Sequence, residues 1–201
     1  PSYLEIGALR ELLPGVNMIA LTASATPQVM DDIAEKLLFK NPEKFRATFE
    51  RPNISYSVFL AESKINKLLE ILKNVPGSSI VYCKTRKTAH RVSGLLQENN
   101  IGAGFYHAGL SQELRDEKQS AWKSGKLRVM CSTNAFGMGI DKSNVRTVIH
   151  FDVPDALESF YQEAGRAGRD GKKAYSVILY NYKDLNNLSQ LHEIKYPTLD
   201  V

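Results

Sequence analysis

Long apolar runs, cysteine clusters and a secretion leader are all absent from this sequence, and each absence excludes a class of protein. The 201 residues contain no stretch of eighteen apolar residues and no charged-then-apolar leader, so we expect no membrane partner and no export. Cys83 and Cys131 are too few for a disulfide framework and lack metal-ligand spacing, so we expect no zinc. We therefore expect a cytosolic or nuclear protein.

The apolar residues form short runs that alternate with longer amphipathic segments, while the whole chain is 43% apolar and 24% charged. This alternation predicts an α/β fold, in which a parallel sheet carries helices on both faces and makes three layers. The predicted strands are 55–60, 79–83, 103–106, 127–131, 147–151 and 175–179. The predicted helices are 64–74, 87–98, 112–123, 157–164 and 184–194.

The first fifty residues follow a different pattern. They predict a helix at 4–13, a break at Pro14-Gly15, a strand at 18–23 and a helix from 27 to about 38. Residues 1–53 carry a net charge of −1 and the remainder +5, which predicts a boundary near residue 50 and two domains, 1–50 and 51–201. Because one strand cannot form a sheet, we expect this segment to be poorly packed or to pair with a second copy.

Two predicted strands are followed by groups that suit phosphate. Cys83-Lys84-Thr85-Arg86-Lys87 combines a helix start with a hydroxyl and several cations. A basic helix face that is merely solvated is the structural alternative. After the next strand, His107 can contact phosphate and Gly109 permits close approach of the backbone, although a structural histidine in a turn fits equally well.

Two glycine-rich segments follow later in the chain. Because each of the four segments follows a predicted strand, we expect all four at the carboxyl edge of the sheet, where open parallel sheets place their ligand-binding loops. After Cys131 come Thr133 and other polar groups, then Gly137 and Gly139, then Asp141, whose carboxylate can accept a sugar hydroxyl or simply cap a turn. Residues 162–171 place two arginines among three glycines at a helix end. An ordinary helix end needs one glycine and one basic residue, so the two guanidinium groups point to a phosphoryl ligand.

Taken in order, these segments resemble the later motifs of superfamily 2 helicases, and specifically those of the RecQ family of DNA helicases. The resemblance extends to about residue 185. The matching runs are Leu21-Thr22-Ala23-Ser24-Ala25-Thr26, Phe49-Glu50-Arg51-Pro52-Asn53, Val81-Tyr82-Cys83-Lys84-Thr85-Arg86, Tyr106-His107-Ala108-Gly109-Leu110, Ala135-Phe136-Gly137-Met138-Gly139-Ile140-Asp141-Lys142 and Tyr161-Gln162-Glu163-Ala164-Gly165-Arg166-Ala167-Gly168-Arg169-Asp170-Gly171.

The resemblance implies a role for each matching position. It makes Arg169 an arginine finger on the γ-phosphate of ATP, with Arg166 beside it and Gln162 in the same network. It places Gly139 and Asp141 at the nucleotide, Asp141 on the ribose. It assigns two further sets of residues: a track, which is a row of residues that bind the phosphates of single-stranded DNA, and a pair that couples the nucleotide state to DNA binding. They are Thr85, Arg86, His107, Gly109 and Thr133 for the track, and Ser24 and Thr26 for the coupling.

The resemblance also implies the architecture and the partners. Residues 51–201 would be the second RecA-like lobe of a 3′-to-5′ DNA helicase that unwinds duplex DNA in recombination and repair, and residues 1–50 the tail of the first lobe. ATP with Mg²⁺ would be held mainly by the first lobe, because these residues contain no Walker loop. Single-stranded and duplex DNA, ATP and the first lobe are the expected partners, and the fragment alone should not hydrolyse ATP. The alternatives are a non-catalytic nucleic-acid-binding module and an RNA helicase lobe.

Overall fold

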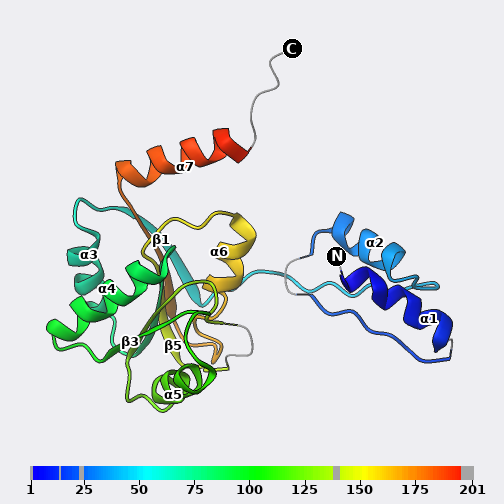
Figure 1. Cartoon of the computed structure of the whole chain (residues 1–201), viewed down its shortest axis with the longest axis horizontal. Coiled ribbons are helices and arrows are strands. Elements are labelled where there is room, and N and C mark those ends of the chain that lie inside the picture. Colours follow the sequence, from blue (N-terminus) through cyan, green and yellow to red (C-terminus); the bar gives the residue numbers. More distant parts are fainter. Residues whose placement is uncertain (1, 14, 23–24, 138–140, 196–201) are drawn as a thin grey trace. The chain divides into compact units, whose positions relative to one another are not determined.

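The computed structural model describes the whole chain except residues 1, 14, 23–24, 138–140 and 196–201. It divides into two compact units, Pro1–Glu50 and Arg51–Val201 (Figure 1). No helix within the described ranges is long and apolar enough to cross a membrane.

The first unit contains the 3₁₀ helix η1 (Ser2–Ala8) and the helices α1 (Leu9–Leu12) and α2 (Pro27–Lys36). Helix α2 begins where expected because Thr26 caps it, its side-chain oxygen accepting the Val29 amide at 3.3 Å, and because Pro27 occupies the first turn. Helix α2 buries none of its residues fully. Ala25 and Leu37, on either side of it, are buried.

The strand predicted at 18–23 is wrong for the residues that the structure describes. Residues 18–22 form no regular element, and Ile19 and Leu21 are 80% and 85% exposed. The physical reason is that a strand needs a neighbour for its amide and carbonyl groups, and the described part of this unit contains no other strand. An apolar run that suits a buried strand is therefore left in solvent.

The second unit is a six-stranded parallel sheet, which confirms the predicted fold class. The strand order is β1-β6-β5-β2-β4-β3. The strands are β1 (Ile54–Leu60), β2 (Ser78–Tyr82), β3 (Ala103–Tyr106), β4 (Val129–Ser132), β5 (Val145–His150) and β6 (Ala174–Tyr180). The helices are α3 (Lys64–Asn74), α4 (Arg86–Glu98), α5 (Gln112–Lys123), α6 (Leu157–Ala164) and α7 (Tyr182–Lys195).

A separate core covers each face of the sheet. On one face, side chains of α3 and α4, such as Leu68 and Leu96, pack on Val81 and on the other strand side chains that point to that face. On the other face Trp122 of α5 packs with Phe136. Figure 1 shows the strands between α3 and α4 on one side and α6 on the other. Because successive residues of a strand point to opposite faces, these buried strands read as continuous apolar runs.

Candidate nucleotide and nucleic-acid site

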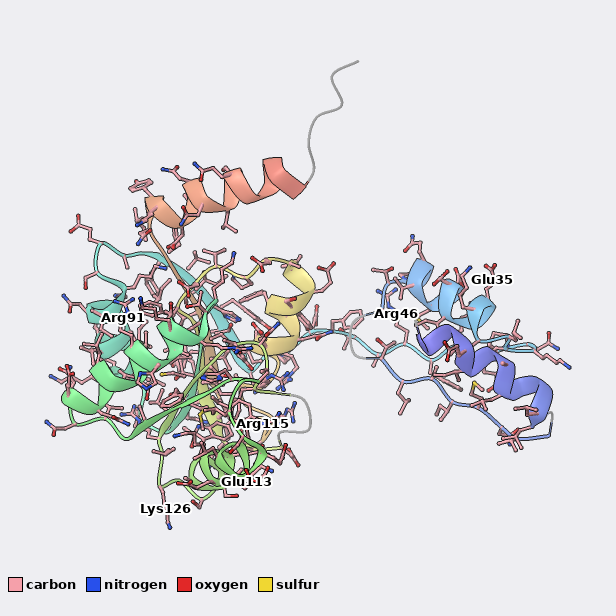
Figure 2. The ribbon with its side chains drawn as sticks, in the orientation of Figure 1. Glu35, Arg46, Arg91, Glu113, Arg115 and Lys126 are labelled. Carbon is pink, nitrogen blue, oxygen red and sulfur yellow. The ribbon has the colours of Figure 1, made fainter. Side chains whose placement is uncertain are left out.

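The first group of predicted site residues lies at the carboxyl edge of the sheet, where β2 leads into α4. Thr85 is the N-cap of α4, and its hydroxyl oxygen accepts the Thr88 amide at 3.0 Å. The preceding amide, that of Lys84, donates to Asp152 Oδ2 at 2.9 Å. Thr85 and Arg86 are both exposed, and Figure 2 shows Arg91 further along the same helix. The start of α4 thus presents a hydroxyl and a guanidinium group on a fixed backbone.

Arg86, His107 and Gly109 are brought together at this edge. A Cβ atom at Gly109 would lie 2.6 Å from Arg86 Nη1 and 3.3 Å from His107 Nδ1. The absence of a side chain at Gly109 therefore leaves space for the Arg86 guanidinium. Burial, and secondarily the Arg86 guanidinium, lower the pKa of His107. His107 Nδ1 is buried and has no hydrogen-bond partner among the described residues.

Thr133 belongs to the same edge and directly follows β4, the strand that lies between β2 and β3 in the sheet. Its amide donates to the carbonyl of Tyr106, the last residue of β3, at 3.4 Å, and its hydroxyl oxygen lies 3.5 Å from the amide of Ala135. The structure therefore places four of these residues on the loops that follow β2, β3 and β4, namely Thr85, His107, Gly109 and Thr133, and Arg86 at the start of α4. Loops at this edge are the usual ligand-binding loops of parallel sheets.

The second group is the arginine turn, which we define as residues 165–171, directly after α6. Arg166 is partly buried, and its Nη1 donates to the carbonyl of Gly137. A Cβ atom at Gly137 would come within 2.3 Å of the Arg166 guanidinium, so this contact requires glycine. Beside it the Tyr82 hydroxyl donates to the Phe136 carbonyl at 2.9 Å. Burial raises the pKa of Tyr82, while the Arg166 charge opposes that shift.

Arg169 lies further along the same turn and is 39% exposed. Its Nη1 is 3.6 Å from Asp141 Oδ1, and the Asp141 carboxylate is 89% exposed. An ion pair this exposed contributes about 0–1 kcal/mol, so an incoming phosphate can displace the carboxylate at little cost. Gln162 is exposed near the end of α6.

Three of the predicted site residues belong to neither group. Gly139 and Ser24 lie outside the described residues. Thr26 caps α2 in the first unit, so its observed contact is structural.

The arginine turn is not at the carboxyl edge, and the sequence prediction that gathered all four segments there is wrong. The amide of Gly168 donates to the carbonyl of Val145, the first residue of β5, at 2.9 Å. The amide of Asp170 likewise donates to Ser143, at 3.2 Å. The reason is that α6 begins after the end of β5 and returns the chain to the start of the next parallel strand. Gly168 and Asp170 therefore lie beside the start of β5, at the opposite end of the strands from the first group. Arg166 reaches back to Gly137 in the loop after β4.

Sequence reasoning missed a buried charge cluster. Lys64 is only 9% exposed, and its ammonium group lies 2.7 Å from Asp184 and 3.3 Å from Asp152 and donates to the carbonyl of Phe151 at 2.8 Å. Asp152 also accepts the Lys84 amide, so the cluster fixes the loop that leads to Thr85. No pattern in the sequence indicates it, because the three charged residues come from three separate segments.

Two residues at the start of the second unit, Arg51 and Asn53, donate to carbonyls of the arginine turn. The sequence contained a signal for them, because both lie in one of the runs that resemble RecQ helicases. The resemblance assigned no role to either residue.

Comparison with known families identifies this arrangement. The profile described as the helicase conserved C-terminal domain matches residues 63–171, more than half of the chain. The chain belongs to this family. The matched range of the helicase domain contains the residues at the start of α4, the loops after β3 and β4, and the whole arginine turn.

Relatives of this helicase domain confirm the RecQ resemblance. It is 43% identical over 187 residues to the ATP-dependent DNA helicase RecQ of Bacillus subtilis, covering 92% of this chain and 32% of that protein. It is 42% identical over 198 residues to the RecQ-like DNA helicase blm-1 of Caenorhabditis elegans, covering 96% of this chain and 20% of that protein. A putative ATP-dependent RNA helicase, R290 of Acanthamoeba polyphaga mimivirus, is 40% identical over 185 residues, with coverages of 91% and 34%. The chain thus spans about a third or less of these relatives.

A solved structure confirms the RecA-like fold. The DEAD-box protein Dbp5 of Saccharomyces cerevisiae, bound to RNA and ADP BeF3, superposes with a TM-score of 0.75. The match covers 96% of this chain and 53% of that chain at 20% sequence identity, so it concerns the fold alone.

Proposed function

We propose that this chain supplies the second motor lobe of an ATP-dependent 3′-to-5′ DNA helicase of RecQ type, which unwinds duplex DNA in recombination and repair. Residues 51–201 form that lobe, and residues 1–50 are the final part of the first, ATP-binding lobe. The helicase domain match and the DNA helicases among the relatives support this assignment. The protein works where the cell keeps its DNA, in the nucleoid of a bacterium or the nucleus of a eukaryote.

The observation that carries the proposal is the unequal setting of two arginines on one turn. Arg166 is fixed by the Gly137 carbonyl, whereas Arg169 extends to a carboxylate that is itself almost fully exposed. Phosphoryl transfer is accelerated by charge placed on the transferred group, and an arginine finger supplies about 10³- to 10⁵-fold in turnover. We assign the finger to Arg169 and the fixing of the turn to Arg166, with Gln162 in the same network.

The nucleotide enters this scheme as ATP with Mg²⁺, held mainly by the first lobe. When bound, the metal neutralises charge on the phosphate oxygens. In this chain Asp141 accepts a ribose hydroxyl and Arg169 donates to the γ-phosphate. We assign Gly139, two residues before Asp141 in the sequence, to the same nucleotide site. Because the α- and β-phosphates separate the ribose of ATP from its γ-phosphate, Asp141 and Arg169, 3.6 Å apart, must separate when ATP binds. The exposure of the pair makes that separation cheap.

Single-stranded nucleic acid follows the carboxyl edge of the sheet. The guanidinium of Arg86 and the hydroxyls of Thr85 and Thr133 donate to backbone phosphates, His107 hydrogen-bonds to the strand, and Gly109 lets the strand approach. Contacts of this kind read no base, so binding is independent of sequence and weakens as salt rises. Closure of the lobes on ATP and opening on ADP then move the strand, and Ser24 and Thr26 transmit the nucleotide state.

The assignment of Arg169 is tested in the full-length protein. We expect Arg169→Ala to bind ATP with a Kd within about threefold of wild type while kcat for hydrolysis falls about 10³-fold or more, because the finger acts on the transition state. Lys172→Ala removes a neighbouring exposed positive charge and serves as the matched control, with hydrolysis expected near wild type. Unchanged turnover in Arg169→Ala rejects the finger.

A motor that acts on RNA is the second candidate, and one observation favours it: the mimivirus relative carries the name of an RNA helicase. The phosphate contacts proposed at the carboxyl edge serve either nucleic acid. The two candidates differ in the duplex that the full-length protein separates.

A further inference from the structure

The first residue of the second unit is hydrogen-bonded to the arginine turn. Arg51 Nη1 donates to the carbonyl of Gly165 at 3.1 Å, and Nη2 donates to those of Ala167 at 3.0 Å and Gly168 at 3.2 Å. More than a hundred residues separate Arg51 from these partners in the sequence. One guanidinium group therefore binds three carbonyls within four consecutive residues.

Asn53 adds a second attachment at the same place. Its Nδ2 donates to the carbonyl of Gly168 at 2.7 Å and to that of Lys172 at 3.0 Å, and its own carbonyl accepts the Ala174 amide at 2.9 Å. A Cβ atom at Gly168 would lie 2.5 Å from Asn53 Nδ2, and Gly168 has a φ of +56°. Glycine at this position thus allows both the turn and the contact.

The chemistry of these contacts favours arginine. The carbonyls that Arg51 binds belong to Gly165, the C-cap of α6, and to Ala167 and Gly168 just after it. They lie near the negative end of the helix dipole, so a cation there is favourable. A guanidinium group is planar, always charged and able to donate several bonds in fixed directions. A lysine ammonium in the same place keeps the charge but cannot donate several hydrogen bonds in these fixed directions.

We propose that Arg51, assisted by Asn53, is a positioning residue for Arg169. The inference rests on the proposed function, because it concerns the placement of the proposed finger. The carbonyls that Arg51 binds belong to Ala167 and Gly168, the two residues directly before Arg169. Fixing these peptide groups sets the direction in which the Arg169 side chain leaves the backbone. Arg51 does this without contacting ATP.

The kinetic test uses the full-length protein and a matched control. Arg128 also donates to three carbonyls, those of Leu72 in the last turn of α3 and of Val75 and Gly77 in the loop before β2. We expect Arg51→Ala to lower kcat for ATP hydrolysis about 10²-fold with KM for ATP within about threefold, since a catalytic group displaced by 1 Å loses about that much rate. We expect Arg128→Ala to keep kcat within about threefold of wild type.

A second readout uses this chain itself and does not depend on catalysis. The amides of Gly168 and Asp170 donate to Val145 and Ser143, so hydrogen exchange reports whether the turn is held. We expect these amides to exchange about tenfold faster or more in Arg51→Ala, and at the wild-type rate in Arg128→Ala. Arg51→Lys keeps the charge and serves if the alanine variant does not fold, with an intermediate kcat expected.

The outcomes separate this inference from the proposed function. If Arg169→Ala hydrolyses ATP normally, the finger itself is refuted, whatever Arg51 does. If Arg169→Ala is inactive while Arg51→Ala matches Arg128→Ala in kcat and in exchange, the positioning role is overturned. A kcat for Arg51→Lys equal to wild type also overturns it, because charge alone would then suffice.

Discussion

Replacing Gly137 with alanine is expected to displace Arg166 from its site. The added Cβ would lie 2.3 Å from Arg166 Cζ and from Nη2, and 2.7 Å from Nε. These atoms are not the free end of an exposed side chain. Arg166 Nη1 donates a hydrogen bond to the carbonyl of Gly137 itself, and Arg166 Nε is buried. Gly137 also has a φ of +154°, which side chains disfavour. The guanidinium must therefore move, and its hydrogen bond must break or lengthen.

The structure sets the size of the effect. Inserting a methyl group into a filled site costs about 1–3 kcal/mol, and losing a hydrogen bond to a charged group costs about 1.5–3 kcal/mol. Because one displacement of Arg166 causes both losses, we expect the free energy of unfolding to fall by about 3 kcal/mol. A control is available in Gly94 of α4, where a Cβ atom would meet nothing within 4 Å. Gly94→Ala should stabilise the helix by up to about 1 kcal/mol.

The assay is urea unfolding of this chain at pH 7, followed by the fluorescence of Trp122. This is the one tryptophan in the sequence, it is fully buried, and its ring centre is 5.3 Å from that of Phe136, the neighbour of Gly137. The probe thus reports on the packing that the substitution disturbs. A loss of less than about 0.5 kcal/mol in Gly137→Ala, the range of ordinary surface substitutions, refutes the reasoning that Arg166 is locked against the Gly137 backbone.

Three further predictions concern groups in the second unit. Arg86→Ala should weaken binding of single-stranded DNA by this chain and lower the slope of log K against log salt by about 0.7, and an unchanged slope would contradict the phosphate contact. Because the pKa of His107 is lowered in the fold, its contribution to stability is complete above its usual value of 6.5 and is lost as the pH falls through the folded value. His107→Gln should flatten that acid limb, and an identical profile counts against it. Burial raises the pKa of Cys83 and of Cys131, so iodoacetamide should modify them only on unfolding, whereas rapid labelling of the native chain would contradict their burial.

The helices and strands of the second unit could be predicted from the sequence because each has a clear local pattern. Helices 64–74, 112–123 and 157–164 and strand 103–106 have the predicted bounds. Ser63 and Ser111 cap the first two of these helices, so their starts were encoded locally. The strand at 18–23 failed because a strand depends on partners elsewhere in the chain, which an apolar run does not reveal.

The site was predictable in composition but not in arrangement. The residues that resemble helicase motifs were identified from their order along the chain, and the structure brings Arg86, His107 and Gly109 together. The position of the arginine turn depends on the direction in which α6 runs, which is a property of topology. The bonds from Arg51 to the turn join distant segments, so no local spacing predicts them.

Strand displacement by the full-length protein tests the central claim most directly. Duplexes of DNA and of RNA, each with a single-stranded tail at the 3′ or the 5′ end, are incubated with and without ATP. We expect ATP-dependent separation of the DNA duplex that carries a 3′ tail, and loss of that separation in Arg169→Ala. Separation of the RNA duplexes alone would assign the lobe to an RNA motor. No separation of any duplex, with nucleic-acid binding retained, would contradict a motor and leave a binding module.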